Sequence, residues 1–530
     1  MVSIDGSIES YCVPNFDSPS IFARMLDKDK GGHFNITPTV QYSTKQNYLP
    51  SSNVLQTKFM NESGVANVTD FLPRVPSTYK ANSKPLLHWL IRRVEVIRGT
   101  MPLVMQCAPA FNYARSSHRT RIVDDTSAPK PQKMALFESE QLSLDLRYVT
   151  DTALEAISEP EISLELLDLS NKGHLGPSVQ ANLNLSEGQV VTFVLRSPPK
   201  TSDASPTRAP DDPYLSKELV SNLLVSTNKY WNDWIRQSTY TGSWKEAVHR
   251  SALALKLLIF EPTGAVVASP TFSLPEYIGG TRNWDYRATW IRDSSFTLYA
   301  LIRLGFTNEA DAFMEFIFER LRHKNPDGSL QIMYTIHGGK DLEELELDHL
   351  DGHKGSKPVR IGNGAADHLQ LKLKRALIFP TPLKDGLYLP WTEDVVANMG
   401  NPDLSIWEVR NKKRHFTYSK IMLWVAIDRG LRLADKRSLP CPNRNKWLEA
   451  RDSLYEEIME KAWNQENKYF GQSYDENDTL DSAVLIMPLV FFMQASDPRF
   501  TSTLKHILKS PERGGLTSNV NNLHRPVLRP

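Results

Sequence analysis

The 530-residue sequence is poor in cysteine, in net charge and in long apolar runs. Its three cysteines are too few for a disulfide framework, and no two of them have the spacing of a metal site. Lys and Arg total 62 against 61 Asp and Glu, and the net charge of +1 lacks the basic field of a nucleic-acid-binding protein. The sequence therefore predicts no nucleic-acid partner.

No segment has the pattern of a membrane span or a secretory signal. The most apolar stretch, 483–495, contains Pro488 and is too short to cross a bilayer, so we expect a buried core helix there. The first residues have neither the basic region nor the apolar region of a signal peptide. We therefore expect a cytoplasmic protein with no membrane partner.

The first 196 residues have the pattern of short antiparallel strands. Segments rich in β-branched and aromatic residues, such as Leu90–Ile97 and Gly188–Arg196, are separated by Gly, Asn and Pro. Because no amphipathic helices intervene, the pattern predicts an antiparallel β-sandwich over 1–196. Residues 197–213 hold five prolines, and they predict a loop that together with a linker helix extends over 197–245.

After residue 245 the apolar residues recur at helical spacing. The segments with this pattern are Glu246–Ile259, Ser294–Leu304, Asn308–Leu321, Tyr418–Ala434 and Asn445–Trp463. Long Gly- and Pro-rich loops separate them, and loops of such length in a compact domain are usually functional. The pattern predicts an α/α barrel over 246–530 whose loops build a pocket. Trp231 and Trp234, at i and i+3, are expected to pack the linker helix against the sandwich.

The segment Gly279–Asp293 is dense in Trp, Tyr, Arg and Asp, and it ends where a helix is predicted to begin. Flat aromatic faces bind the apolar side of a sugar ring, while Arg and Asp make paired hydrogen bonds with vicinal hydroxyls. Asp293 alone fits a helix N-cap equally well. A second polar segment, 402–420, favours the sugar-binding interpretation.

Glu408 follows Trp407 in that second segment, before a predicted helix. An apolar wall raises the pKa of a carboxyl group, as a general acid requires. The spacing by itself favours a salt bridge of Glu408 with Arg410, Arg414 or Lys420 over this role. Both interpretations stay open at this point.

Two patterns resemble metal sites only superficially. His349 and His353 have the i, i+4 spacing of helical ligands, but Gly352 interrupts the helix and no third ligand accompanies them. The segment Asp475–Asp481 lacks the glycine of a calcium loop, and we expect it to cap a helix. We expect no metal and no other cofactor.

Long motifs in this sequence resemble the inverting glycoside hydrolases of family 15, which include glucoamylases, glucodextranases and prokaryotic-type trehalases. These motifs are GGTRNWDYRATWIRDSSFTLYALIRLG and PDLSIWEVRNKKRHFTYSKIMLWVAIDRGLRLAD. The first residues, including Asp5–Ile8 and Phe16–Arg24, are similar to that family's trehalase-like N-terminal domain. The resemblance implies a multidomain protein: an N-terminal antiparallel β-sandwich, a helical linker and an all-α (α/α)6 toroid of the six-hairpin glycosidase type.

The resemblance also implies an activity, the hydrolysis of α-glucosidic bonds with inversion and release of glucose. The implied substrate is a small α-glucoside or oligosaccharide such as trehalose, maltose or an α-glucan, with trehalose or a small oligosaccharide favoured. Glu408 matches the general acid, Arg292 and Asp293 match the pair that grips the terminal glucose, and Trp290 matches a pocket aromatic. The remaining matches to pocket segments are Arg360, Asn363 and Trp407.

The sequence departs from the family's pattern in two places. An inverting hydrolase needs a second carboxylate about 6.5–9.5 Å from the acid, and no stretch before Pro530 matches that base motif. Residues 372–384 also differ from the amphipathic helix of the family. We therefore expect a toroid that is incomplete at the C-terminal end. The alternative to the enzyme is a non-catalytic glucoside-binding or inactive homologue that lacks the general base.

Overall fold

The computed structural model describes residues 1–74, 87–126, 128, 130–154, 156–198, 213–323, 325, 331–367, 388–407 and 412–508. The chain divides into two compact units. The first comprises Met1–Ala288, Leu301–Ala310 and Glu343–Asn363, and the second comprises Thr289–Ala300, Asp311–Leu342 and Gly364–Pro530. The domain bounds expected from the sequence stay a prediction.

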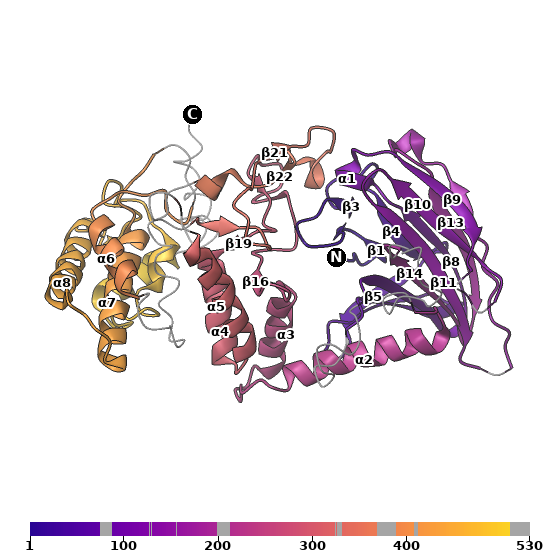
Figure 1. Ribbon diagram of the computed structural model, residues 1–530, viewed down its shortest axis with the longest axis horizontal. Helices are drawn as coiled ribbons and strands as arrows, with labels where there is room; N and C mark the ends of the chain where they lie inside the picture. The colour runs from indigo at the N-terminus through magenta and orange to yellow at the C-terminus, as the bar shows by residue number, and fades with distance from the viewer. Residues whose placement is uncertain are drawn as a thin grey trace. The chain divides into compact units, whose positions relative to one another are not determined.

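A 12-stranded antiparallel sheet dominates the first unit (Figure 1). Its main path runs in the order β5-β6-β7-β8-β14-β11-β10-β9. The strands are β1 (Ser7–Ile8), β4 (His33–Pro38), β5 (Ser43–Tyr48), β6 (Leu55–Met60), β7 (Gly64–Phe71), β8 (Trp89–Ala108), β9 (His118–Asp124), β10 (Lys133–Ser139), β11 (Ser143–Thr152), β12 (Glu165–Leu167), β13 (Ser178–Ser186) and β14 (Gln189–Arg196). The predicted antiparallel β structure is confirmed, and its arrangement as a sandwich stays a prediction.

Strand β8 joins the two parts of this sheet. Its first half pairs with β7 and β14, and its second half pairs with β4 and β13. Gly99 lies between the two halves, where the partner strands of β8 change, and its φ is +69°. A Cβ atom there would stand 2.1 Å from the carbonyl oxygen of Ser63. Only glycine fits this conformation and this close approach. One buried cluster takes side chains from both halves of β8, including Val94 and Met105.

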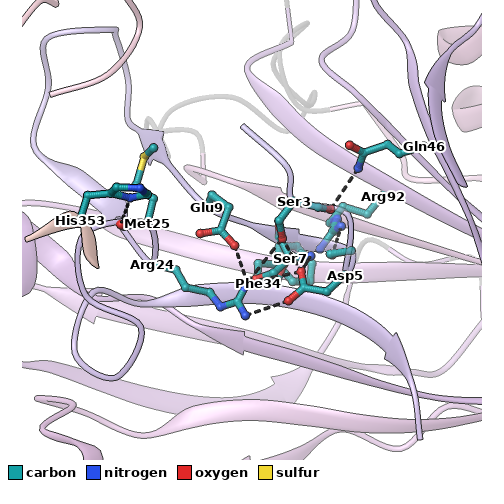
Figure 2. A network of polar contacts seen from close by, with 11 residues as sticks. Ser3, Asp5, Ser7, Glu9, Arg24, Met25, Phe34, Gln46, Arg92 and His353 are labelled. Carbon is teal, nitrogen blue, oxygen red and sulfur yellow. Dashed lines mark hydrogen bonds and ion pairs between the residues drawn. The ribbon is translucent and has the colours of Figure 1, made fainter. Parts of the chain in front are cut away.

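A buried arginine fastens the N-terminal strand to this sheet (Figure 2). Arg92 is fully buried, and its Nε donates to Oδ1 of Asp70 at 2.7 Å. Its two terminal nitrogens donate to the carbonyl oxygens of Phe34 and Gly6. A buried charge is tolerated when it is paired and hydrogen-bonded in this way, so Arg92 stabilises the docking of β1.

Short elements complete the first unit. Its two-stranded pieces are β2 (Tyr11–Cys12) with β3 (Ser20–Phe22), β15 (Ile259–Phe260) with β16 (Ala265–Val266), β17 (Leu274–Pro275) with β18 (Asn283–Trp284), and β21 (Leu345–Glu346) with β22 (Arg360–Ile361). Its helices are α2 (Lys217–Ile235) and α3 (Lys245–Lys256), with short turns at α1 (Phe111–Ala114), η1 (Ser170–Lys172) and η2 (His353–Gly355).

Helix α2 is the predicted linker helix, and its two tryptophans have different surroundings. Trp231 lies beside Arg74, which follows β7, at 5.9 Å from the guanidinium carbon to the ring centroid. Trp234 instead stacks on Phe306 with ring centroids 4.1 Å apart, and its Nε1 donates to Glu309 at 2.7 Å. The expected packing against the sheet therefore describes Trp231. Trp234 instead contacts Phe306 and Glu309, which lie directly before and within α5 (Thr307–Arg322).

Helices dominate the second unit. They are α4 (Ile291–Arg303) and α5 (Thr307–Arg322), which cross the division between the units, and α6 (Tyr388–Asn398), α7 (Thr417–Arg437), α8 (Arg444–Lys461) and α9 (Pro498–Ile507). Short pieces are η3 (Gly364–Asp367), η5 (Ser482–Ile486), β19 (Thr289–Trp290) with β20 (Met333–Tyr334), and β23 (Trp463–Asn464) with β24 (Tyr469–Phe470).

Helices α6, α7 and α8 pack on one another around a shared core (Figure 1). Val395, Ile427 and Trp447, one from each helix, are fully buried in it. Each of the five helices that periodicity predicts is confirmed, as α3, α4, α5, α7 and α8. The closed toroid stays a prediction.

The helix expected over 483–495 is wrong. The chain forms only η5, which ends at Ile486, and continues in turns in which Phe491 has φ +62°. Pro488 explains the difference because it has no N–H to donate and its ring clashes with the preceding helical turn. Among the described residues, none of the helices combines the length and the apolar character needed to cross a membrane.

Candidate active site

Arg292 and Asp293 form an ion pair in the first turn of α4. Nε of Arg292 donates to Oδ1 of Asp293 at 3.0 Å, and Nη2 donates to Oδ2 at 3.3 Å. The Asp293 side chain is 40% exposed, so its carboxylate can reach a ligand. The helix begins at Ile291, so Asp293 lies inside the first turn and is not the N-cap that the sequence left open. The positive end of the helix dipole stabilises its charge there.

Short strand pairing fixes the backbone just before this ion pair. Trp290 on β19 pairs with Met333 on β20, and the Ile291 amide donates to the Ile332 carbonyl at 3.3 Å. The Ser294 hydroxyl donates to the Trp290 carbonyl at 2.8 Å, which ties the first turn of α4 to the strand. Trp290 itself is only 2% exposed. Its role as a sugar-binding aromatic stays a prediction.

Arg360 lies on β22 in the first unit, where carboxylates and an aromatic ring surround it. Its Nη2 donates to Glu346 at 2.9 Å, and its Nη1 donates to the Thr281 carbonyl at 2.8 Å. The guanidinium carbon lies 5.0 Å from the centroid of the Trp284 ring. The side chain is 13% exposed. Arg360 is thus held in one orientation by groups of its own unit.

Asn363, three residues later, is buried and bonds to Asp285. Its Nδ2 donates to the Asp285 carbonyl at 3.1 Å, and the amide of Gly362 donates to Oδ2 of Asp285 at 3.2 Å. The same carboxylate accepts a 2.6 Å bond from Arg287. Asp285 and Arg287 lie in the polar motif Gly279–Asp293, but the sequence alone indicates no role for them. The density of Arg and Asp in that motif is the only signal that could have found them.

Trp407 is held by a buried carboxylate in the second unit. Its Nε1 donates to Oδ2 of Asp481 at 2.9 Å. Asp481 also accepts a bond from the Ala483 amide at 2.8 Å and so caps η5, which confirms the cap expected for 475–481. Asp481 is 1% exposed, so this contact fixes the position of Trp407.

Glu408 and Arg410 lie outside the described residues, so the general acid and its competing salt bridge both stay predictions. The other two candidate partners of that bridge have contacts elsewhere. Arg414 pairs with Glu476 at 2.6 Å. Lys420 is 1% exposed and donates to the carbonyl oxygens of Met399 and Asn401. Burial lowers the pKa of the Lys420 ammonium below its ordinary value.

The two histidines with metal-like spacing bond to backbone oxygens. Nε2 of His349 donates to the Tyr113 carbonyl at 2.7 Å, and Nδ1 of His353 donates to the Met25 carbonyl at 2.9 Å. Among the residues that the structure describes, no three His, Cys, Asp or Glu side chains are grouped to hold a metal ion. These contacts give both histidines a structural role.

The structure thus brings together Arg292 with Asp293, Trp407 with Asp481, and Asn363 with Asp285. Trp290, Arg292, Asp293 and Trp407 belong to the second unit, and Arg360 and Asn363 belong to the first. What these groups offer chemically is a partly exposed Arg–Asp pair, which can make charge-assisted hydrogen bonds to neutral hydroxyls.

Comparisons with known proteins identify the family. The model described as Glycosyl hydrolases family 15 matches residues 242–373 and 391–525, and a model described as Trehalase-like, N-terminal matches residues 1–129. The unmatched stretch between the two parts overlaps 372–384, the segment whose sequence departs from the family pattern.

Proteins named Trehalase match almost the whole chain. The protein from Thermoplasma acidophilum is 33% identical over 524 residues, which cover 96% of this chain and 81% of that protein. The one from Mycolicibacterium smegmatis is 33% identical over 540 residues, covering 97% and 76%, and the one from Mycobacterium tuberculosis is 32% identical over 555 residues, covering 97% and 74%. The chain therefore belongs to glycosyl hydrolase family 15 and is a glycoside hydrolase.

Proposed function

We propose that this glycoside hydrolase cleaves α,α-trehalose with inversion and releases two molecules of glucose. The relatives that match nearly all of the chain are named Trehalase, and the model that matches residues 1–129 is trehalase-like. The structural observation that carries the proposal is the Arg292–Asp293 pair, because it is charged, partly exposed and fixed at a helix N-terminus.

In this mechanism Arg292 and Asp293 hold the terminal glucose. The Asp293 carboxylate accepts hydrogen bonds from sugar hydroxyls, and the Arg292 guanidinium donates to their oxygens. Holding the ring fixes the anomeric carbon relative to the catalytic groups, and such positioning lowers the entropic part of the barrier. Trp290, Trp407, Arg360 and Asn363 complete the proposed binding residues.

Glu408 is the proposed general acid. It gives its proton to the oxygen between the two sugars as the bond from the anomeric carbon to that oxygen breaks. A water molecule attacks the same carbon from the opposite face and passes its proton to a second carboxylate. Inversion converts one α-linked unit to β-glucose, while the leaving unit departs as α-glucose.

The test is glucose release by the full 530-residue chain from trehalose, maltose and soluble starch, with the product anomers followed by NMR. We expect trehalose to be the best substrate and α- and β-glucose to appear in equal amounts before mutarotation. Glu408→Gln should lower kcat by about 10²–10⁴-fold, the usual contribution of a general acid. Asp293→Asn should lower kcat/KM by about 10–100-fold, because hydrogen bonds to a charged group are lost.

Asp435→Asn is the matched control, since Asp435 is an exposed carboxylate of the same unit paired with Arg444. It should leave glucose release unchanged. Preference for maltose or starch would contradict trehalose as the substrate, and initial release of α-glucose alone would contradict inversion. Sugar binding by calorimetry without any glucose release would instead support the non-catalytic alternative.

A further inference from the structure

Tyr113 lies in the N-terminal β structure (residues 7–196), and it bonds to two segments much later in the chain. Its hydroxyl oxygen accepts a hydrogen bond from Nη2 of Arg287 at 2.9 Å. Its carbonyl oxygen accepts one from Nε2 of His349 at 2.7 Å. Arg287 precedes Trp290 by three residues, and His349 belongs to the segment 343–363, which contains Arg360 and Asn363. Both segments thus lead to proposed sugar-binding residues.

The backbone of Tyr113 has a conformation that L-residues rarely adopt. Asn112, Tyr113 and Ala114 have φ values of +50°, +59° and +62° in succession. Left-handed conformations at non-glycine residues persist only where surrounding contacts compensate for them, and they are common at functional sites. Tyr113 is 4% exposed, so its contacts with Arg287 and His349 are among those that maintain this turn.

Arg287 uses its whole guanidinium group to join separate parts of the chain. Its Nε and Nη2 donate to the carboxylate of Asp285 at 2.9 and 2.6 Å, and its Nη1 donates to the Ser18 carbonyl at 2.9 Å. The guanidinium carbon lies 4.5 Å from the centroid of the Phe272 ring. A lysine could not reproduce these contacts, since they need the planar arrangement of several donors.

Asp285 connects Arg287 to the segment 343–363 by hydrogen bonds. Its Oδ2 accepts a hydrogen bond from the Gly362 amide at 3.2 Å, and its carbonyl accepts one from Asn363 at 3.1 Å. A continuous set of bonds therefore runs from Tyr113 through Arg287 and Asp285 to Asn363. A shift of Tyr113 or Arg287 must move Asp285, Gly362 and Asn363 or break these bonds.

Other residues of the N-terminal β structure fasten the segment 343–363 directly. Nζ of Lys30 donates to the His349 carbonyl at 2.6 Å. The His353 ring donates to the carbonyl of Met25 at 2.9 Å (Figure 2). Apolar side chains add to this contact, because Tyr113 shares one buried cluster with Phe272 and with residues of the same segment, Leu347, Leu350 and Val359.

We propose that Tyr113 and Arg287 form a clamp through which the N-terminal β structure positions the sugar-binding segments for hydrolysis. Tyr113 is a positioning residue in this proposal: it acts through Arg287 and His349 and does not touch the sugar. The trehalase-like N-terminal region is then part of the catalytic machinery. The inference rests on the proposed function.

The test compares Tyr113→Phe with Tyr148→Phe, and Arg287→Lys with Arg92→Lys. Tyr148 is a matched control because it is a buried tyrosine of the same unit whose hydroxyl donates to the Ile162 carbonyl. Arg92 is a buried arginine paired with Asp70 in the core of the sheet. For each variant we would measure kcat, KM, the pH profile and the thermal midpoint of unfolding.

We expect Tyr113→Phe to lower kcat by about tenfold and Arg287→Lys by about 100-fold, the effect of misplacing binding groups by about 1 Å. Each control should lose stability while its kcat stays within about twofold. The shape of the pH profile should not change, because neither clamp residue carries a proton in the reaction. If the clamp variants and their controls show the same kcat at equal loss of stability, the clamp is refuted.

Hydrogen exchange separates this inference from the proposed function. If the wild-type chain hydrolyses no α-glucoside, the proposed function fails, but the clamp still predicts an observable effect. Tyr113→Phe should then speed amide exchange in 268–293 and in 343–363, and Tyr148→Phe should leave exchange there unchanged. Unchanged exchange in both segments of Tyr113→Phe would overturn the clamp.

Discussion

The indole nitrogen of Trp407 donates a 2.9 Å hydrogen bond to Asp481, a residue 74 positions later in the sequence. Asp481 is buried and at the same time caps η5 through the Ala483 amide. The residue just before the proposed general acid is thereby fastened to the turn that begins η5. The position of Trp407 depends on a carboxylate that no local motif connects to it.

Removing this hydrogen bond should impair catalysis as well as stability. Trp407→Phe keeps an aromatic ring but has no donor for Asp481, and the loss of a bond to a charged group costs about 1.5–3 kcal/mol. We expect kcat/KM for trehalose to fall by about tenfold or more, because Glu408 follows directly. The control is Trp447→Phe, because the Trp447 indole in the same unit also donates to a carboxylate, that of Glu393, at 2.6 Å. Equal losses of kcat/KM in the two variants would contradict this role.

Stability should fall as the pH drops below 6.5, and His33 should account for part of the loss. Burial and then the nearby His174 lower the pKa of His33 from 6.5 to about 4, although a hydrogen bond to Gln106 acts in the opposite direction. Since the folded-state pKa lies below the unfolded value, the stabilising contribution is complete above pH 6.5. It is lost as the pH falls through about 4.

This difference corresponds to about 2–3 kcal/mol when the partial exposure of the ring is allowed for. Urea unfolding of the wild type and of His33→Gln at pH 7.5 and pH 4.5 measures it. The variant should be less sensitive to acid than the wild type. His323→Gln, which changes an exposed histidine, should keep the wild-type sensitivity. An unchanged acid sensitivity in His33→Gln would show that its ring titrates normally in the folded chain.

Local patterns in the sequence are sufficient for many of the helices and strands, whereas the Arg292–Asp293 pair is indicated only by the family resemblance. Helical periodicity predicts five helices correctly because each buries one apolar face. The β-branched and aromatic segments Leu90–Ile97 and Gly188–Arg196 predict β8 and β14 correctly. The predicted helix over 483–495 is wrong because Pro488 stops the helix despite the apolar composition of this stretch. The sequence alone does not separate a cap from a ligand at Asp293, because it places helix starts only to within a few residues.

Contacts between distant residues could not be predicted in this way. Arg287 and Tyr113 are 174 residues apart, and Trp234 and Glu309 are 75 apart, so no spacing rule connects them. The roles of Asp285 and Asp481 likewise depend on tertiary partners. The family resemblance identified the segment around Glu408, but it did not reveal which residues hold such segments in place.

Replacing Glu309 should destabilise the first unit by leaving a buried lysine with fewer partners. Lys256 is 8% exposed, and its Nζ lies 2.9 Å from carboxylate oxygens of Glu309 and of Glu261. Glu309→Gln removes one of these two charges while it keeps an acceptor for Trp234. We expect a loss of about 2–3 kcal/mol in the free energy of unfolding, somewhat below that for an uncompensated buried charge. Asp435→Asn, in an exposed pair, should cost less than about 1 kcal/mol. An equal loss of unfolding free energy in Glu309→Gln and Asp435→Asn would mean that water, and not Glu309, stabilises the charge of Lys256.

Position 99, where the partner strands of β8 change, should tolerate no side chain. Alanine there would combine φ +69° with a Cβ only 2.1 Å from the Ser63 carbonyl, and this backbone atom can move only if the β7–β8 pairing is distorted. The left-handed conformation alone costs an L-residue about 1–2 kcal/mol, so Gly99→Ala should lose at least about 2 kcal/mol.

Gly400→Ala is the control, because its Cβ would meet nothing within 4 Å and its φ is not positive. Its stability, measured by the midpoint of urea unfolding, should match or slightly exceed that of the wild type, since alanine restricts the unfolded chain. If both variants unfold at the wild-type midpoint, the close approach of Gly99 to Ser63 does not hold the two halves of β8 in register.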